Sequence, residues 1–479
     1  MFRASRLLAC ALLLCGCDKP VPPPTNWPPN PVLPEIKPPP EVKEEKVRPT
    51  LPKRSRYFNF GVKPGFVLGR NPAGKEPKTF ASHFKHVADA GEHFVRIHFT
   101  HMPKDESPGE IAPYMLKAWD AILDSAEENG LAVMPVLGAW AEWNDGRNTE
   151  TWHAWDKNPF NVRNGGPAKN PNELYDDTEC RTLWLKRLDT LVKRWAHRKA
   201  IVAWEIFSEV DLVSGANEDR AVDFVQLAAK VILSHDPKRP ITVSQAGVNE
   251  WPKLCRSPYV EFLQVHPYAD GGIAGRLDDM ILLHVRQRLK QYGKPVMIGE
   301  SGLDSGPPRG KTLDTAPRAE IGVRHAIWAA MVSGAMNGRA LWWQDGYDEF
   351  ESADLCRHYH AIAKPAVAFA KGMDFGGFAP VECKLSDGVR GAMLGNERSR
   401  IGWVRDAHCI PPQWPDAAVS GQSVTMDAPG GAWEVEFFNT KTGLPVGDMA
   451  IVKTAFGRLT VPVPEFRESI AFKMNPWPR

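Results

Sequence analysis

The strongest constraint on the fold is a regular alternation of short apolar runs and amphipathic stretches that begins near Tyr57. The apolar runs have the length of buried strands, and the stretches between them repeat apolar residues at helical spacing. The runs are Phe58–Val62, His93–Phe99, Leu131–Leu137, Ile201–Phe207, Ile241–Ser244, Phe262–His266, Val296–Gly299 and Ala340–Trp343. The helical stretches include Ile111–Asn129, Glu173–His197, Glu218–His235, Leu277–Tyr292 and Arg318–Met336.

Eight strands that alternate with helices predict an α/β fold, a parallel (β/α)8 TIM barrel over residues 53–375. The main alternative is a doubly wound open sheet. Such sheets usually carry a glycine-rich loop after the first strand, and Gly61–Gly65 does not match a dinucleotide-binding fingerprint. The barrel is therefore the preferred prediction.

The pattern changes after about residue 375. Short alternating runs such as Ile401–Val404, Trp433–Phe438 and Ser469–Phe472 are separated by turn residues. Alternation of this kind is typical of antiparallel sheets. We predict a small C-terminal β-sandwich over residues 376–479, which either binds carbohydrate or braces the barrel.

The N-terminal segment has the pattern of a processing signal. Arg3 and Arg6 precede an apolar run that is too short to span a bilayer, which predicts a signal peptide over residues 1–16. The following Cys17 closes a sequence that resembles the lipobox of bacterial lipoproteins. That resemblance implies lipidation of Cys17 and a chain anchored in a membrane of the cell envelope. An ordinary cleaved signal is the alternative.

Residues 17–52 are dense in proline, lysine and glutamate. A segment of this composition has little to bury, so we expect an extended linker without a packed core. It would serve as a stalk between the anchor and the barrel.

Composition excludes several functions. The chain has 59 basic and 57 acidic residues and a net charge of +2, which gives no basis for nucleic-acid binding. After removal of the signal peptide and lipidation of Cys17 five cysteines would remain, an odd number, and no Cys/His spacing of a zinc site occurs. We expect no cofactor, no metal site and a monomeric chain.

Two glutamates follow predicted strands at positions suited to chemistry. Glu209 ends the fourth strand and Glu300 ends the seventh, and catalytic groups of such barrels lie at the C-terminal ends of the strands. Strands four and seven lie across the ring from each other. Two carboxyl groups about 5 Å apart suit double displacement at a sugar. Two solvated loop glutamates are the structural alternative.

Four motifs in chain order resemble glycoside hydrolase family 5 and its relatives in clan A, especially bacterial mannanase-like members. They are Trp204–Asp211, Gln264–Tyr268, Pro295–Gly302 and Leu341–Asp345. The resemblance covers about residues 57–372 and implies Glu209 as acid/base and Glu300 as nucleophile. Glu205, on the same strand four residues earlier, is expected to be paired inside the barrel because an unpaired carboxylate there would be destabilising.

One position departs from the family pattern. The family has asparagine immediately before the acid/base, and this chain has Ser208. That asparagine would donate to the sugar 2-hydroxyl, a contact that strengthens in the transition state. The shorter serine makes a non-catalytic barrel that only binds glycan a second hypothesis.

Other residues are candidates for substrate binding. Arg96, on the second strand, resembles the family arginine that keeps the nucleophile ionised, and a structural ion pair is the alternative. His266 and Tyr268 share a strand face, with Tyr268 directed toward Glu300, although a core histidine is equally plausible. Of Trp342 and Trp343 only one can line the sugar site, and we favour Trp343.

The long loop after the third strand, residues 138–172, carries Trp140, Trp143, Trp152 and Trp155 beside amide side chains. Flat rings suit the apolar faces of sugars, whereas a tryptophan-rich plug on the barrel rim is the alternative. Taken together, the sequence predicts a retaining β-glycoside hydrolase acting on a β-mannan or β-glucan type of carbohydrate. A binding barrel without turnover and a structural envelope lipoprotein remain as alternatives.

Overall fold

The computed structural model describes residues 56–58, 65–72, 77–99, 107–146, 155–269, 276–302, 318, 320–338, 353–410 and 414–478, with side chains of the helix at 353–370 described from residue 361. The described residues belong to one compact unit, Arg48–Arg479. Within them, none of the helices combines the length and apolar character that a bilayer crossing requires.

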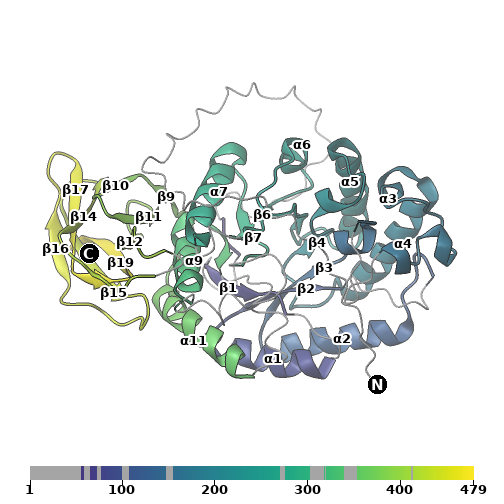
Figure 1. Cartoon of the computed structure of the whole chain (residues 1–479), viewed down its shortest axis with the longest axis horizontal. Coiled ribbons are helices and arrows are strands. Elements are labelled where there is room, and N and C mark those ends of the chain that lie inside the picture. The colour runs from purple at the N-terminus through teal and green to yellow at the C-terminus, as the bar shows by residue number, and fades with distance from the viewer. Residues whose placement is uncertain are drawn as a thin grey trace, which may run out of the picture. The chain divides into compact units, whose positions relative to one another are not determined.

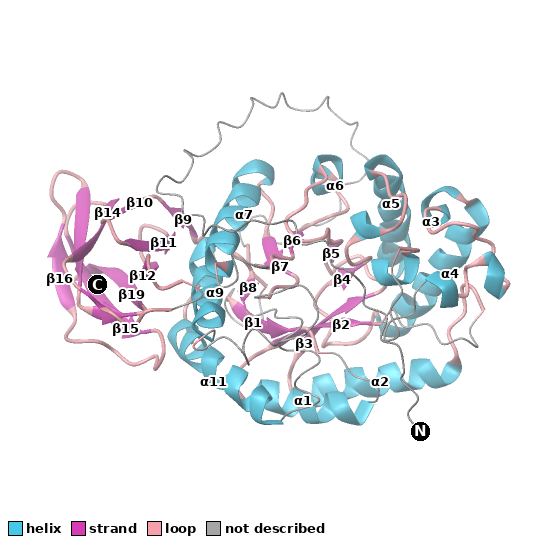
Figure 2. Ribbon diagram, viewed as in Figure 1, coloured by secondary structure: helices cyan, strands magenta, loops and turns pink. Residues whose placement is uncertain are grey.

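Strands and helices alternate through the first part of this unit (Figures 1 and 2). The strands are β1 Val67–Arg70, β2 Phe94–His98, β3 Ala132–Val136, β4 Trp204–Glu205, β5 Ile241–Thr242, β6 Leu263–Val265, β7 Val296–Ile298 and β8 Asn337–Gly338. The helices are α1 Pro77–Asp89, α2 Pro113–Glu128, α3 Glu173–Asp176, α4 Thr178–Trp195, α5 Glu218–His235, α6 Pro252–Arg256, α7 Leu277–Tyr292, α9 Glu320–Ser333 and α11 Ala353–Ala370. The helical periodicity therefore predicted α2, α4, α5, α7 and α9 to within a few residues.

The strands form a six-stranded parallel sheet in the order β5-β4-β3-β2-β1-β8 and a parallel pair β6-β7. Hydrogen bonds link the two sheets on both sides. The Thr242 hydroxyl donates to the carbonyl of Phe262 at 2.7 Å, and the Asn337 amide donates to the carbonyl of Ile298 at 2.9 Å and accepts from its N–H at 2.8 Å. This curled parallel arrangement with surrounding helices is consistent with the predicted barrel.

The first predicted strand is wrong. Phe58 lies outside any strand, residues 59–62 lie outside the described part, and β1 is Val67–Arg70. Phe58 instead packs with Phe94 and Phe262 in a small apolar cluster, with ring centroids 6.5 and 5.9 Å apart. The last strand begins earlier than predicted, at Asn337, and Ala340–Trp343 lies outside the described residues.

The C-terminal region consists of antiparallel sheets, as predicted. A six-stranded sheet has the order β16-β15-β19-β12-β11-β9, a three-stranded sheet β10-β14-β17, and β13 pairs with β18. Their bounds are β9 Ala379–Val381, β10 Cys383–Leu385, β11 Val389–Gly395, β12 Arg400–Asp406, β13 Ala418–Val419, β14 Gln422–Asp427, β15 Ala432–Asn439, β16 Ala450–Lys453, β17 Arg458–Val463, β18 Phe466–Arg467 and β19 Ser469–Trp477. One apolar cluster draws side chains from both larger sheets, such as Val404 and Val461.

This region shares a core with the helices of the first part. Trp403 and Phe438 belong to the same apolar cluster as α9, whose residues Ile321–Ser333 are all buried. Because α9 is buried on every face, other elements must surround it. The strands β11 and β12 of the C-terminal region cover one side. Buried Arg405 on β12 donates to Asp278 on α7 at 2.5 Å.

Candidate active site

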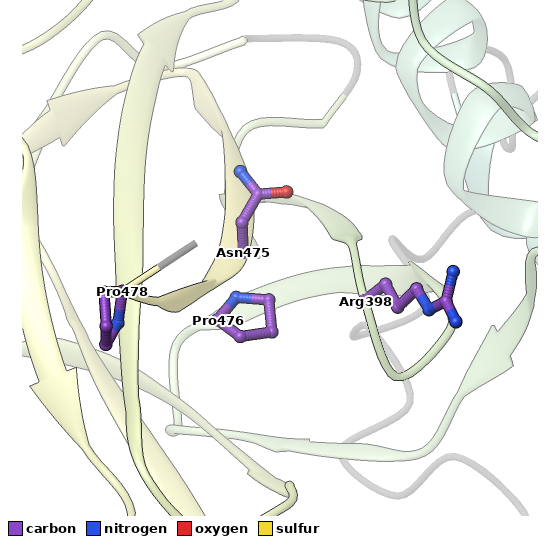
Figure 3. A pocket seen from close by; sticks show the side chains of 4 residues that line it. All are labelled: Arg398, Asn475, Pro476 and Pro478. Carbon is purple, nitrogen blue, oxygen red and sulfur yellow. The ribbon is translucent and has the colours of Figure 1, made fainter.

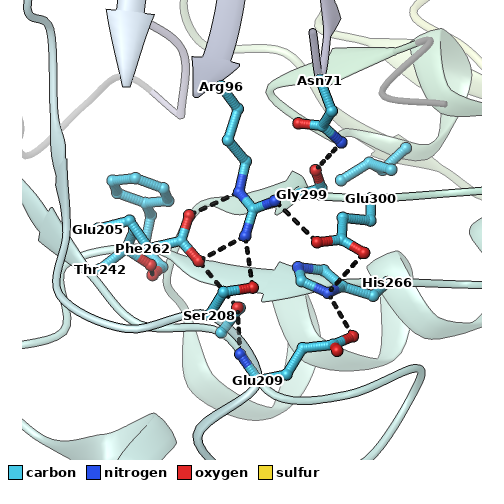
Figure 4. A network of polar contacts seen from close by, with 12 residues as sticks. Asn71, Arg96, Glu205, Ser208, Glu209, Thr242, Phe262, His266, Gly299 and Glu300 are labelled. Carbon is cyan, nitrogen blue, oxygen red and sulfur yellow. Dashed lines mark hydrogen bonds and ion pairs between the residues drawn. The ribbon is translucent and has the colours of Figure 1, made fainter. Parts of the chain in front are cut away.

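The candidate active site lies where β2, β4, β6 and β7 end. Arg96 is on β2, Ser208 and Glu209 follow β4, His266 and Tyr268 follow β6, and Glu300 follows β7. Because the strands are parallel, their C-terminal ends meet on one rim. The fold thus brings these side chains together, and Figure 4 shows Arg96, Glu209, His266, Glu300 and Ser208.

Arg96 is the centre of the network. Its guanidinium donates to both oxygens of Glu205, at 2.7 and 2.8 Å, and to Glu300 Oε1 at 2.9 Å. A further bond of 2.8 Å goes from Arg96 Nη2 to the Ser208 hydroxyl. Arg96 is only 1% exposed, so the partners are what makes its burial tolerable. Glu205 is therefore buried and paired with Arg96, as its position predicted.

His266 and Tyr268 both face the two strand-end glutamates, as period-two alternation predicts. His266 Nδ1 lies 2.9 Å from Glu209 Oε1 and 3.7 Å from Glu300 Oε2. The Tyr268 hydroxyl donates to Glu300 Oε2 at 2.7 Å. Each glutamate thus has a defined partner, and His266 bridges the two (Figure 4).

The backbone at Glu209 adopts a left-handed conformation with φ of 55°. A side chain with a Cβ atom pays about 1 kcal/mol or more for this region, so surrounding contacts must hold it. The Glu209 N–H donates to the Ser244 hydroxyl at 3.0 Å, and that hydroxyl donates to Glu205 at 2.8 Å. The strained turn directs the Glu209 side chain toward His266.

The environment separates the two strand-end carboxyl groups electrostatically. Burial alone would raise the pKa of Glu300, but the charges of His266 and Arg96, with the Tyr268 hydrogen bond, lower that pKa to about 2. Burial and the negative charge of Glu300 raise the pKa of Glu209 above its ordinary value. Burial would also raise the pKa of Glu205, yet Arg96 lowers it. One carboxyl is thus held ionised and the other is favoured as an acid.

Several residues that support the site escaped the sequence analysis. The Asn71 amide donates to the carbonyl of Gly299 at 2.9 Å, and Ser244 fixes the turn at Glu209. A Cβ atom on Gly299 would lie 2.0 Å from Gln264 Oε1 and 2.5 Å from His266 Nε2, so only glycine fits there. The polar residues Arg70 and Asn71, at the end of β1, were the available signal for Asn71. That signal was missed because the first strand was predicted at the wrong place.

The aromatic candidates behave differently. Trp143 was predicted to contact substrate, but it is completely buried and packs against Trp155 and Phe160, with ring centroids 5.6 and 5.1 Å apart. Its short 3-10 helix, Trp140–Trp143, turns it into the core, which corrects that prediction in favour of the plug. Trp140 is half-buried. Trp342, Trp343 and Cys17 lie outside the described residues.

Among the described residues, Glu209, His266 and Glu300 each offer one ligand atom, and these atoms lie within 4.8 Å of one another. The sequence prediction of no zinc site considered only the spacing of cysteines and histidines. It therefore does not bear on a group made of one histidine and two glutamates. The cysteines with described side chains, Cys180, Cys255, Cys383 and Cys409, are free thiols.

A different hollow, of about 360 Å³, lies in the C-terminal region and is lined by Arg398, Asn475, Pro476 and Pro478 (Figure 3). Only one of these four side chains is ionisable. The residues that line this hollow include no carboxylate, whereas the strand-end site contains two close to each other. The strand-end site is therefore the candidate active site.

The chain matches the family described as Cellulase (glycosyl hydrolase family 5) over residues 63–333, more than half of its length. Mannan endo-1,4-beta-mannosidase A of Hypocrea jecorina is 26% identical over 211 residues, which cover 40% of this chain and 45% of that relative. The match thus spans less than half of the curated relative.

Solved structures share the fold at low sequence identity. A glycoside hydrolase superposes with a TM-score of 0.57 at 12% identity, covering 90% of this chain and 97% of that one. A glycoside hydrolase family 5 structure from Bacteroides vulgatus gives a TM-score of 0.55 at 12% identity, covering 87% and 90%. From the family match over residues 63–333, the chain belongs to glycoside hydrolase family 5.

Proposed function

We propose that this protein is a retaining β-glycoside hydrolase in which Glu300 is the nucleophile and Glu209 the acid/base. The observation that carries the proposal is the separation of the two carboxylates, whose facing oxygens lie within 4.8 Å. Retaining enzymes hold their carboxyl groups about 5–5.5 Å apart, whereas inverting enzymes need about 6.5–9.5 Å to admit a water. A separation of at most 4.8 Å between these oxygens lies below the inverting range and supports the retaining mechanism.

The opposite pKa shifts fit the two roles. Ionised Glu300 attacks the anomeric carbon while protonated Glu209 donates to the leaving oxygen, and a glycosyl ester on Glu300 forms. Glu209, now ionised, then accepts a proton from water as that water cleaves the ester. Arg96 and Tyr268 hold Glu300 from two sides at 2.9 and 2.7 Å, which fixes its direction of attack.

For substrate we propose a β-linked mannan or glucan. The resemblance of the motifs to mannanase-like members supports mannan first, as does the similarity to the Hypocrea mannan endo-1,4-beta-mannosidase A. Half-buried Trp140 follows β3, and its backbone N–H donates to the carbonyl of Ser208 at 3.1 Å, so we propose that this ring contacts a sugar.

The test is azide rescue of two alanine variants of the full chain, with dinitrophenyl β-glycosides as substrates. Glu300→Ala lacks the nucleophile, so azide attacks directly and yields the α-glycosyl azide. Glu209→Ala still forms the glycosyl ester with this activated leaving group, and azide then yields the β-glycosyl azide. Exchanged products would reverse the assigned roles. Full activity in either variant without azide would refute the mechanism.

A second function, glycan binding without turnover, is favoured by one observation. Ser208 stands where the family has asparagine, and its hydroxyl is already engaged by Arg96 at 2.8 Å. Micromolar binding of β-mannan or β-glucan oligosaccharides by calorimetry, with no product from any of a panel of mannans, glucans, xylans and galactosides, would favour this function over hydrolysis.

We also propose, from the sequence at Cys17, that a lipid anchor and a proline-rich stalk hold a (β/α)8 barrel and a β-sandwich at the cell envelope. Metabolic labelling with a radioactive fatty acid should mark the wild-type chain and not Cys17→Ser. Equal labelling of both would reject the anchor, while the proposed hydrolase would be unaffected.

A further inference from the structure

The three side chains Glu209, His266 and Glu300 have a capacity that the proposed hydrolysis does not use. Each comes from a different strand end, all three are buried, and their ligand atoms lie within 4.8 Å of one another. We infer that these residues form a binding site for a divalent transition-metal ion, represented by Zn²⁺, and that the ion excludes substrate. The site is an inhibitory one, separate from any need of the reaction.

The spacing of the ligand atoms suits a small ion. Zn²⁺ forms bonds of about 2.0–2.2 Å to imidazole nitrogen and carboxylate oxygen, which in a tetrahedron places ligand atoms roughly 3.3–3.5 Å apart. His266 Nδ1 lies 2.9 Å from Glu209 Oε1 and 3.7 Å from Glu300 Oε2, on either side of that value. Side-chain shifts of a few tenths of an ångström would complete these two edges.

The donor set selects among metals. One imidazole nitrogen with two carboxylate oxygens suits Zn²⁺, Cu²⁺ or Ni²⁺, whereas Mg²⁺ and Ca²⁺ prefer six or more oxygen ligands. Arg96 donates to Glu300 Oε1 at 2.9 Å and the Tyr268 hydroxyl donates to Oε2 at 2.7 Å. Since a carboxylate oxygen has two lone pairs, Oε2 can accept from Tyr268 with one and bind the ion with the other. Three protein ligands leave a fourth position open to water, as in many zinc sites.

The charge of the site favours a dication. Metal binding requires Glu209 ionised and His266 neutral. In that state the network holds three carboxylates (Glu205, Glu209 and Glu300) and the single guanidinium of Arg96, so it carries −3 + 1 = −2. A Zn²⁺ ion would neutralise it, with Arg96 moderating the affinity by repulsion. The Glu209 and Glu300 side chains are 11% and 8% exposed, so both reach solvent.

Exclusion of substrate follows from the same geometry. If the anomeric carbon sits between Glu209 and Glu300, the ion and the sugar need the same space. This consequence rests on the proposed function, whereas binding of the ion does not. The two are therefore tested separately.

The first experiment measures Zn²⁺ binding to the full-length chain by isothermal titration calorimetry, without substrate. We expect one Zn²⁺ per chain at this site, no matching heat with Mg²⁺, and at least a tenfold loss of affinity in both His266→Asn and Glu209→Gln, with circular dichroism confirming that each variant is folded. The matched controls are His235→Asn, which removes a surface histidine beside Asp189, and Cys383→Ser, which removes a thiol. Neither control should change the affinity.

Retained affinity in His266→Asn and Glu209→Gln, or loss of affinity in either control, would overturn the site. So would the absence of binding at millimolar Zn²⁺ and neutral pH. The second experiment follows turnover, where Zn²⁺ should raise KM and leave kcat unchanged. Zn²⁺ binding in a chain that hydrolyses no glycoside would support the site and reject the proposed function, and hydrolysis insensitive to Zn²⁺ would do the reverse.

Discussion

Two buried arginines in this chain serve contrasting networks. Arg96 and Arg405 are both only 1% exposed, and each binds carboxylates from elements distant in the sequence. Arg405 joins Asp278 at 2.5 Å and Asp279 at 3.1 Å, and also donates to the carbonyl of Asp406 at 3.0 Å. The guanidinium of Arg405 pairs with these carboxylates, and the ion pairs link β12 to α7.

The Arg96 network is built differently. Arg96 pairs with Glu205 and Glu300, and His266 connects Glu300 to a third carboxylate, Glu209. The Glu209 and Glu300 side chains keep some exposure to solvent. The lesson is that burial of a charge alone does not mark a reactive site, because both networks have it. Both networks also have more carboxylates than arginines. The Arg96 network differs because two of its carboxyl groups lie at the ends of parallel strands, share His266 and have pKa values shifted in opposite directions.

The largest expected effect contrasts Glu300→Gln with Asp278→Asn. Loss of the proposed nucleophile should lower kcat on the order of 10⁴-fold or more while the fold remains stable. Asp278→Asn removes a charge from the other network, so its kcat below the melting temperature should stay within about threefold, since architecture and chemistry are separate. Kinetics and thermal melts of both variants measure this. Equal losses of activity would erase the distinction.

Arg405→Met should lower the free energy of unfolding by about 3–5 kcal/mol, because Asp278 is left buried without its partner. The double variant Arg405→Met with Asp278→Leu should recover much of that loss, since replacing both partners by apolar side chains is often neutral. Urea unfolding of the three chains provides the measurement. A single variant as stable as wild type would show that the pair is not structural.

Tyr268→Phe should shift the acid limb of kcat/KM. The Tyr268 hydroxyl helps to lower the pKa of Glu300 to about 2, so its removal should raise that pKa and protonate the proposed nucleophile at higher pH. A hydrogen bond to a charged group is worth about 1.5–3 kcal/mol, which corresponds to roughly 1–2 pH units. Tyr292→Phe, whose hydroxyl bonds Glu250 away from the site, is the control and should leave the profile unchanged. A shift to lower pH would contradict the assignment.

Ser208→Ala should have the smallest effect. It removes one of the acceptors of Arg96, while both Glu205 oxygens and Glu300 remain bound. Loss of one hydrogen bond of about 0.5–1.5 kcal/mol predicts a decrease in kcat of roughly threefold to tenfold. Ser234→Ala, on the surface of α5, controls for the substitution itself. A decrease beyond a hundredfold would mean that Ser208 takes part directly in catalysis.

The grouping of these side chains could be predicted because most of them lie at or just beyond the ends of apolar runs. Glu209, His266 and Glu300 could be placed on one rim by strand order alone, and Glu205 by the cost of an unpaired buried carboxylate. The first strand could not be predicted in this way. Gly69 interrupts its apolar run because the Phe94 ring occupies the space of a side chain, where a Cβ atom would lie 2.4 Å from Phe94 Cδ1.

Trp143 shows the other limit. A tryptophan in a loop beside a catalytic rim suits a sugar face and a buried plug equally well, and periodicity does not distinguish them. The decision depends on how the loop after β3 folds back, and there Trp155 and Phe160 cover the indole. Contacts of Trp143 with residues more than ten positions away in the loop decide that it is buried, which the local sequence could not show.

The burial of α9 on every face has a consequence for biogenesis. Part of the cover of that helix comes from β11 and β12, and β12 is itself paired with β19, one of the last segments to be synthesised. Domains tend to fold from the N-terminus as the ribosome proceeds, but here an apolar helix must wait for strands that emerge much later. Until those strands are made, the nascent chain exposes an apolar surface that is prone to aggregate. We therefore expect a chaperone that binds the unfolded chain to increase the yield of folded protein.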